Sequence, residues 1–168
     1  MIILGINAYH ADSSACLFIN GELIAAAEEE RFKRIKHWAG FPIESILFCL
    51  NEANITLNQV NYICIGRDPY AKIFYKIFFL IKNIFSIKGL LFSRFNNTKS
   101  LINFKSQLLN ISNLDIKTLE SKIKYIEHHR SHLASAFFAS PFKESAILSI
   151  DGSGDFTTTM LAVGKGNK

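Results

Sequence analysis

The dipeptide Asn20-Gly21 restricts the fold of this chain more than any other feature, because it lies between two stretches that both predict β-strands. Asn-Gly is the strongest short signal for a two-residue hairpin turn. Residues 14–19 before the turn and 2–7 further upstream are apolar, and residues 22–28 continue the pattern after it. We therefore expect three strands, with a loop between the first two and a tight hairpin between the last two.

A helix and a fourth strand are expected next. Pro42 lies near the first turn of the predicted helix, where proline is well tolerated. Apolar residues recur at helical spacing from Ile43 to Leu50, and a short apolar stretch over 60–66 predicts a buried strand. A hairpin followed by a crossover to a further strand favours an α/β layer over a helical bundle. The predicted fold class is therefore α/β.

The size and composition of the chain bound its class. With 168 residues, 49% of them hydrophobic and only three prolines, the chain has enough apolar sequence to bury one core. Cys16, Cys49 and Cys64 are far apart, form no CxxC pair and lie in apolar stretches, where a thiol packs as a small hydrophobic group. No signal peptide is recognised either, and we expect a reducing, cytoplasmic setting.

The positive charge of the chain is concentrated in its middle. Residues 61–126 hold eleven Lys or Arg and three Asp or Glu, whereas the whole chain has a net charge of +5. These basic residues are scattered and match no nucleic-acid-binding motif, so no nucleic-acid partner is expected.

Residues 73–92 are rich in Ile and Phe, as a membrane-spanning helix would be. Lys76, Lys82 and Lys88 interrupt this stretch every six residues, and no apolar run approaches the ~20 residues that span a bilayer. We expect no transmembrane segment here. The alternatives that remain are an amphipathic helix that covers the core and one that contacts a membrane surface or a partner.

Three histidines lie in the run Glu127-His-His-Arg-Ser-His-Leu133, at the start of a predicted helix that ends before Pro141 and follows a short predicted strand over 124–127. Two imidazoles at i and i+4 share one helix face, with Cβ atoms about 5–6 Å apart, and can hold one metal ion between them. The plainer alternative is that the histidines lie on an ordinary solvated surface.

The helical period indicates which two histidines would pair. His129 aligns with Leu133 and Phe137 in an apolar stripe that should face the core. His128 and His132 share their stripe with small side chains, which leave room for an ion and its ligands. The predicted pair is therefore His128 with His132, and a carboxylate at the end of the next strand would supply a third ligand.

The run Asp151-Gly-Ser-Gly-Asp155 is predicted to be a loop between strands over 145–150 and 156–163. Two glycines between two carboxylates suit backbone amides that wrap a phosphate while the acids hold or orient a cation. Metal and phosphate are the first functional hypothesis. Asp155 and the acidic run Glu28-Glu-Glu30 are expected to be structural or capping residues.

Several motifs in order along the chain resemble those of the ATP-dependent O-carbamoyltransferases, the enzymes that carbamoylate nodulation factors and antibiotics. The resembling segments are, beside the histidine run, residues 5–15, 28–32, 36–37, 40–42 and 151–154. The resemblance covers both ends of the chain and leaves residues 70–120 unmatched.

This resemblance implies a ribonuclease H-like fold, shared with sugar kinases, actin and the heat-shock ATPases. It also implies similarity to the tRNA threonylcarbamoyl transferases. Residues 1–140 would form the first subdomain, with a helical insert at about 70–120, and residues 141–168 would begin the second subdomain.

The family's chemistry implies a nucleotide and a metal, usually iron. Carbamoyl phosphate and ATP are converted to carbamoyl-adenylate, and the carbamoyl group then passes to an acceptor hydroxyl. By the resemblance, metal-ligand positions fall on His128, His132 and Asp151, and positions that pack against the phosphate of ATP fall on Gly152, Ser153 and Gly154.

Two further residues fall on catalytic positions of the family. His10 falls near the acceptor hydroxyl, where a general base commonly contributes about 10²–10⁴ in rate. Lys36 falls near the carbamoyl-adenylate. Each has a plainer alternative, which is a bond to a loop carbonyl for His10 and a solvated basic face for Lys36.

Members of this family are much longer than 168 residues and carry the rest of the nucleotide site and a separate C-terminal domain. We therefore expect no carbamoyltransferase activity from these residues alone, and expect the missing domains as partners in cis or in trans. The alternative is a non-catalytic remnant, or a metal- or nucleotide-binding module that needs a partner chain. A tRNA threonylcarbamoyl transferase fits less well, because its helix usually carries a single histidine. A sugar kinase or a chaperone ATPase fits less well still, because neither needs the histidine pair.

Overall fold

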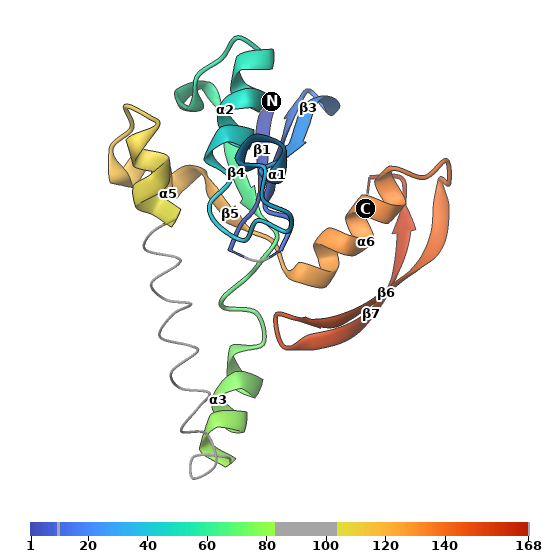
Figure 1. Ribbon diagram of the computed structural model, residues 1–168. Coiled ribbons are helices and arrows are strands. Elements are labelled where there is room, and N and C mark those ends of the chain that lie inside the picture. The colour runs from blue at the N-terminus through green and yellow to red at the C-terminus, as the bar shows by residue number, and fades with distance from the viewer. Residues whose placement is uncertain (10, 83–103, 168) are drawn as a thin grey trace. The chain divides into compact units, whose positions relative to one another are not determined.

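The chain forms two compact units in a computed structural model that describes residues 1–9, 11–82 and 104–167 (Figure 1). Unit 1 comprises Met1–Ile65 and Phe85–Lys124, and unit 2 comprises Gly66–Ile84 and Tyr125–Lys168. Each unit is therefore built from two separate stretches of the sequence.

Unit 1 is organised around a five-stranded sheet with the order β3-β2-β1-β4-β5. Its strands are β1 (Ile2–Asn7), β2 (Ser14–Ile19), β3 (Glu22–Glu28), β4 (Tyr62–Ile65) and β5 (Ile123–Tyr125). Strands β1, β2 and β3 pair antiparallel, whereas β4 pairs parallel to β1. The predicted α/β class is confirmed, and the order of strands agrees with the ribonuclease H-like fold that the resemblance implies.

The turn between β2 and β3 is the one that the sequence predicts. Asn20 has φ 54° and Gly21 has φ 91°, which are the positive values that a two-residue primed turn requires. The three N-terminal strands therefore lie where the apolar stretches predict them.

Helices cover the sheet of unit 1. They are α1 (Glu30–Lys33), α2 (Ile43–Glu52), the 3-10 helix η1 (Leu57–Gln59) and α5 (Ile116–Lys122), and residues 104–110 are also helical. Helix α2 packs against β2 and β3, and Leu17, Ile46 and Ile63 are fully buried in the core. Phe104 is buried as well, with its ring 5.6 Å from that of Phe41, so part of the predicted helical insert belongs to this core.

The acidic run after β3 contributes a structural carboxylate, as expected. Glu29 is fully buried, and its carboxylate accepts hydrogen bonds from the backbone N–H of Ser45 at 2.9 Å and of Glu44 at 3.3 Å, and from the Ser45 hydroxyl at 2.8 Å. A carboxylate suits this place because the first N–H groups of a helix have no partner within the helix and carry partial positive charge. Glu29 therefore holds the start of α2.

In its described residues, unit 2 has a two-stranded hairpin and two helices. The elements are α3 (Ile73–Lys82), α6 (His128–Phe138), β6 (Glu144–Gly154) and β7 (Thr157–Lys165). Helix α6 packs along the hairpin (Figure 1), and its buried side chains are His129, Leu133 and Phe137. The predicted apolar stripe of this helix is confirmed.

The predicted loop over 151–155 is wrong in its position. Residues Asp151–Gly154 form the last part of β6, and the turn itself is made by Asp155 and Phe156, with φ of 47° and 66°. Glycine favours turns, which is why the sequence places the loop at the glycines. Here the turn is made by two residues that lack the backbone freedom of glycine. Glycine is needed at position 154 because its backbone lies close to another side chain, described below.

Three smaller outcomes concern boundaries. Strand β5 begins one residue before the predicted strand over 124–127 and ends two residues before its predicted end, at Tyr125. Residues 83–103 of the predicted insert lie outside the described residues. The predicted subdomain boundary near residue 140 stays a prediction, since the division into compact units groups α6 with the hairpin.

The structure bears on membrane insertion in one respect. In the ranges that it describes, no helix combines the length and the apolar character needed to cross a bilayer.

Candidate metal centre

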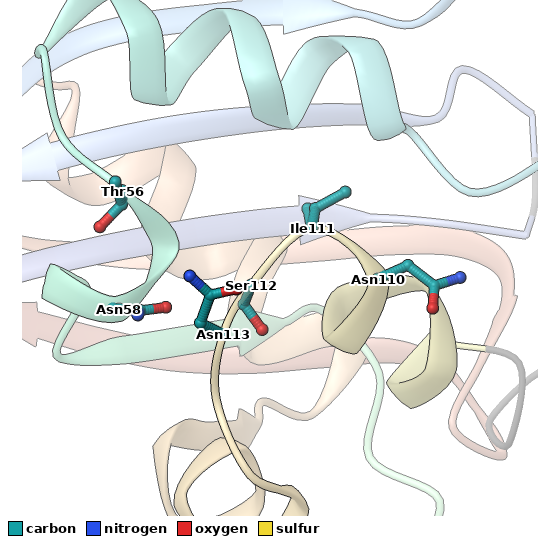
Figure 2. Close-up of a pocket in the computed structure, with 6 residues that line it drawn as sticks. All are labelled: Thr56, Asn58, Asn110, Ile111, Ser112 and Asn113. Carbon is teal, nitrogen blue, oxygen red and sulfur yellow. The ribbon is translucent and has the colours of Figure 1, made fainter.

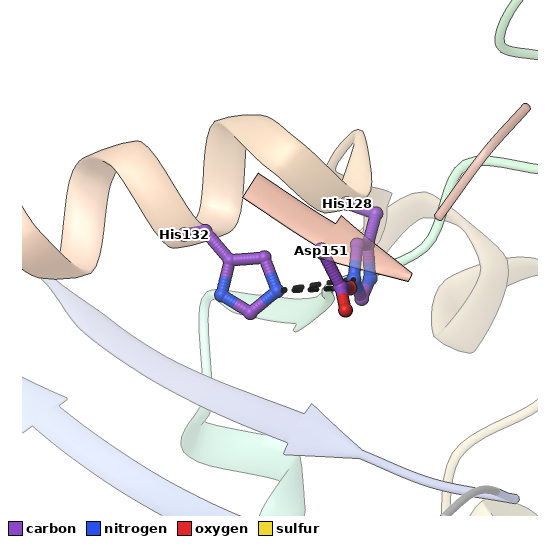
Figure 3. A group of neighbouring side chains, drawn as sticks. All are labelled: His128, His132 and Asp151. Carbon is purple, nitrogen blue, oxygen red and sulfur yellow. Dashed lines mark hydrogen bonds and ion pairs between the residues drawn. The ribbon is translucent and has the colours of Figure 1, made fainter. Parts of the chain in front are cut away.

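Side chains from α6 and the end of β6 converge within unit 2 (Figure 3). His128 Nε2 lies 2.7 Å from Asp151 Oδ2 and 3.0 Å from His132 Nε2, and His132 Nε2 lies 3.6 Å from Asp151 Oδ2. These three are the residues to which the resemblance assigns metal-ligand positions. The structure brings all of them together.

The separations fit a shared metal ion. Ligand atoms about 2.1 Å from one ion lie about 3.0–3.4 Å from each other in octahedral or tetrahedral arrangements. The three observed separations bracket this range, and one potential ligand atom from each residue lies within 4.8 Å of the others. Two imidazoles and a carboxylate form a donor set suited to iron, zinc or another first-row divalent cation.

A hydrogen bond on the far side of the ring orients His128. Its Nδ1 lies 3.3 Å from the carbonyl oxygen of Gly66, so Nδ1–H would donate to that oxygen when a metal ion takes the place of the Nε2 proton that bonds Asp151. Histidine ligands commonly hold their orientation through such a bond. Gly66 directly follows β4, and nothing in its local sequence distinguishes it as part of the site.

Asp155 supports the same region through its carboxylate. Asp155 Oδ2 accepts hydrogen bonds from the backbone N–H of His128 at 2.9 Å and of Asp68 at 2.7 Å. It therefore joins the hairpin turn to the start of α6 and to the segment that leads to α3. This is a structural role, as expected for Asp155.

Gly154 leaves the space that the His128 ring occupies. A Cβ added at Gly154 would lie 1.9 Å from Cδ2 and 2.3 Å from Cγ of His128. Both atoms belong to a ring whose position is also held by the Gly66 carbonyl and by Asp151. The second glycine of the Asp-Gly-Ser-Gly motif is therefore explained by packing against the histidine.

The neighbouring groups favour the charged form of Asp151. The hydrogen bond with His128, and next the backbone N–H of Gly152, lower the pKa of the Asp151 carboxyl from its usual value. The side chain is partly exposed. A carboxylate that is ionised at neutral pH is the form that binds a cation.

His129 has a different role from its neighbours. It is fully buried, and its ring lies 2.8 Å from the Ser149 hydroxyl through Nδ1 and 3.1 Å from the Thr157 carbonyl through Nε2. Both ring nitrogens are thus used within unit 2. The prediction that His129 faces the core is confirmed. His128 and His132 lie together, as the helical period predicts, and their pairing on a metal ion stays a prediction.

The structure does not test the other assigned residues. His10 lies outside the described residues. Lys36 is exposed and belongs to unit 1. Gly152 and Ser153 are exposed in β6, and their contact with a phosphate stays a prediction.

A separate cavity of about 300 Å³ lies in unit 1 (Figure 2). Its lining consists of Thr56, Asn58, Asn110, Ile111, Ser112 and Asn113. None of these side chains is a strong metal ligand or titrates near neutral pH. In the described ranges, the group of side chains that could hold a metal ion is the histidine cluster of unit 2.

The fold and this cluster define the class of the protein as an α/β chain with a candidate metal centre on a helix and a hairpin. The chain belongs to the family described as carbamoyltransferase N-terminus, whose model matches residues 2–168. The resemblance inferred from the motifs is therefore confirmed, and the match includes the middle segment that the motifs left out.

Relatives at moderate identity support the same family. The chain is 39% identical over 173 residues to an uncharacterised protein of Synechocystis, covering 99% of this chain and 28% of the relative. It is 33% identical over 171 residues to the nodulation protein NolNO of Sinorhizobium fredii, covering 96% of this chain and 22% of the relative. The chain thus spans about a quarter of the length of these relatives.

Among solved structures, the chain is similar to YeaZ from Pseudomonas aeruginosa. The identity is 12%, the TM-score is 0.43, and the match covers 96% of this chain and 64% of the other. A likeness at this level carries no argument about function.

Proposed function

We propose that this chain is the N-terminal, metal-binding part of a carbamoyltransferase that moves a carbamoyl group from carbamoyl phosphate, through carbamoyl-adenylate, to an acceptor hydroxyl. The observation that carries the proposal is the convergence of His128, His132 and Asp151 in a member of the carbamoyltransferase family. Neither the family nor the cluster alone would assign these three residues a role.

The three residues would hold a divalent cation, for which iron is proposed. Such an ion supplies Lewis-acid stabilisation of charge that develops on an oxygen of the reacting group. His128 Nε2 would face the ion while the Gly66 carbonyl holds Nδ1, and Asp155 would keep the start of α6 in place. The protein's own contribution is thus to orient the ligands before the substrate binds.

Other residues would act on the organic groups. His10 would accept the proton of the acceptor hydroxyl, because a hydroxyl is a weak nucleophile at neutral pH. Lys36 would lie near the carbamoyl-adenylate and offset its negative charge. Gly152 and Ser153, which are exposed, would face the phosphate of ATP, whereas Gly154 is buried against the His128 ring.

The remaining three quarters of the relatives' length would supply what this segment lacks. We propose that the 168 residues are inactive alone and act together with further domains in cis or in trans. This follows from the share of the relatives that the chain covers, which is 28% and 22% for the two described above.

Metal binding is the first test. The purified chain, titrated with Fe²⁺ without oxygen, should bind one ion, and His132→Ala should weaken the affinity by at least about tenfold, the smaller loss seen when supporting groups of metal sites are removed. The matched control is His37→Ala, which also removes an exposed imidazole beside a carboxylate, that of Asp12. Absence of stoichiometric binding, or equal losses in both variants, would contradict the proposed centre.

Activity is the second test. ATP, carbamoyl phosphate and an acceptor alcohol should give no carbamoylated product with the 168-residue chain. The native polypeptide, together with any partner that co-purifies, should give product and lose it in His132→Ala. Turnover by the short chain would refute the proposed inactivity.

A non-catalytic binding module is the second candidate, favoured by the short span of the chain relative to its relatives. In that case the chain would bind metal, or ATP in equilibrium dialysis, and no partner would restore carbamoyl transfer. A native product of 19.0 kDa with no associated chain would favour this candidate.

A further inference from the structure

Helix α3 of unit 2 exposes an apolar stripe. Phe74, Ile77, Phe78 and Ile81 are 81%, 46%, 67% and 66% exposed. Their spacing, i, i+3, i+4 and i+7, places them on one face of the helix. No residue of α3 is buried, so this is an apolar helix face with nothing packed on it in the described residues.

The other side of α3 contacts its own unit. The Phe79 ring lies 5.6 Å from that of Phe156 in an edge-to-face contact, and Lys76 Nζ donates to the carbonyl oxygen of Pro69 at 3.1 Å. At 100° per residue, Phe79 and Lys76 lie on the side opposite to the centre of the stripe. The helix is therefore held by one side while its apolar stripe faces outward.

The sequence of α3 and the residues that follow it carry charge of a single sign. From residue 69 to residue 114 the sequence has seven Lys or Arg and no Asp or Glu. Lys82, at the end of α3, is exposed and lies beside the apolar stripe on the helical wheel. Aromatic and aliphatic side chains flanked by lysines are the composition of helices that lie in the interface of anionic membranes.

We propose that α3 docks unit 2 on the surface of a bilayer that contains anionic phospholipid. Phe74, Ile77, Phe78 and Ile81 would enter the boundary between headgroups and acyl chains, with Lys82 reaching the lipid phosphates. The described part of α3 has 10 residues, is about 15 Å long and is too short to cross a hydrocarbon core of about 30 Å. Docking would therefore be peripheral and reversible.

The complementary charge favours a lipid surface over an apolar groove of another protein. A groove that receives the stripe would need only apolar contacts, whereas 46 consecutive residues without an acidic side chain match a surface of negative charge. The proposal does not depend on carbamoyl transfer, so it can fail or hold independently of the proposed function.

The test is flotation of the purified chain with vesicles. Vesicles of phosphatidylcholine with about one third phosphatidylglycerol should bind the chain, and vesicles of phosphatidylcholine alone should bind it much less. Binding should fall at high salt, because surface charge is screened within about 3 Å at 1 M ionic strength. The double variant Phe74→Ser/Phe78→Ser should lower the partition coefficient by about tenfold or more, since each phenyl group loses its burial in lipid.

A matched double variant controls for non-specific adsorption of exposed apolar side chains to vesicles. Leu148 and Leu161 form an exposed cross-strand pair on the hairpin of unit 2, 56% and 74% exposed. Leu148→Ser/Leu161→Ser removes a comparable apolar area and should leave vesicle binding unchanged. Circular dichroism would verify that both variants remain folded.

Several results would overturn the proposal. One is equal binding to both kinds of vesicle, and another is equal loss in the two double variants. Self-association of the chain that is lost only in Phe74→Ser/Phe78→Ser, without vesicle binding, would assign the stripe to a second copy. Vesicle binding by the short chain but not by the full native polypeptide would show that another part of the protein covers α3.

Discussion

The two compact units differ in how completely their sheets are covered. In unit 1, the central strands and α2 bury Leu17, Ile46 and Ile63 fully. In unit 2, α6 covers one face of the β6–β7 hairpin, while Leu148 and Leu161 on the other face are largely exposed. The candidate metal centre thus belongs to the unit with the smaller core.

This difference has a physical consequence for the site. A hairpin gains most of its stability from packing on a face rather than from its own hydrogen bonds. Asp151 lies on β6, and its partners His128 and His132 lie on α6. The geometry of the site therefore depends on the packing of α6 against the hairpin. We expect the stability of the protein and the geometry of the site to respond to different substitutions.

The largest expected effect is on the core of unit 1. Ile46→Ala should lower the free energy of unfolding by about 2–5 kcal/mol, because it leaves a cavity in a packed core. Leu161→Ala in unit 2, at a largely exposed position, should change it by less than about 0.5 kcal/mol. Urea unfolding followed by circular dichroism measures both. Equal losses of unfolding free energy in the two variants would contradict the difference between the units.

The second substitution tests the packing between β6 and α6 that supports the site. Gly154→Ala should destabilise unit 2 by about 1–3 kcal/mol and reduce metal affinity, because the new Cβ would overlap the His128 ring. Calorimetric titration with a divalent cation and thermal unfolding measure the two changes.

A neighbouring glycine provides the control for that experiment. A Cβ at Gly152 would meet no atom within 4 Å, so Gly152→Ala should leave both stability and metal affinity close to those of the parent chain. If Gly154→Ala binds metal as tightly as Gly152→Ala, the ring of His128 is not held as the structure indicates.

A third experiment uses a thiol to report on the opening of unit 1. Burial, the largest cause, raises the pKa of Cys49 to about 11. Since the thiolate is the reactive form and the side chain is fully buried, alkylation at pH 8 should be at least about a hundredfold slower than for an ordinary exposed thiol with a pKa near 9. Peptide mapping after timed iodoacetamide treatment gives the rate at each cysteine.

The same shift predicts a dependence of stability on pH. The folded-state pKa of Cys49 is raised, so its contribution to stability is present below the unfolded pKa and is lost as the pH rises through about 11. Rapid labelling of Cys49 at pH 8 in the folded protein would show that the core of unit 1 opens more readily than its packing implies.

The smallest effect concerns a second histidine–carboxylate pair, in unit 1. His37 Nδ1 lies 2.9 Å from Asp12 Oδ1, and the hydrogen bond with Asp12, followed by the charge of Asp12, raises the pKa of His37. The stabilisation is therefore present below the unfolded pKa of about 6.5 and is lost as the pH rises through the folded pKa. An exposed pair contributes little.

Asp12→Asn isolates this small contribution. It should return the pKa of His37 toward its ordinary value in an NMR titration and remove the slight extra stability at acidic pH. It should leave metal binding unchanged, because a single imidazole beside one carboxylate lacks the third ligand that distinguishes the cluster in unit 2. An unchanged His37 titration would show that the pair does not form in solution.

Much of the local structure was predictable from the sequence because its signals act over a few residues. The Asn20-Gly21 turn, the start of α2 after Pro42 and the buried stripe of α6 all follow from turn chemistry or helical period. The choice of His128 with His132 over His129 rests on the same period. The loop over 151–155 was misplaced because glycine was interpreted through its backbone freedom alone.

By itself, the sequence determined the α/β class, the order of the N-terminal elements, the family and which two histidines lie on the same face of α6, since each of these depends on short patterns and their order along the chain. Only the tertiary structure decided that Gly66 orients His128, that Asp155 joins three segments, that Gly154 leaves room for a ring and that the stripe of α3 faces outward. Gly66 and His128 are 62 residues apart. Contacts over such separations arise from how packed elements meet, and no local propensity encodes them.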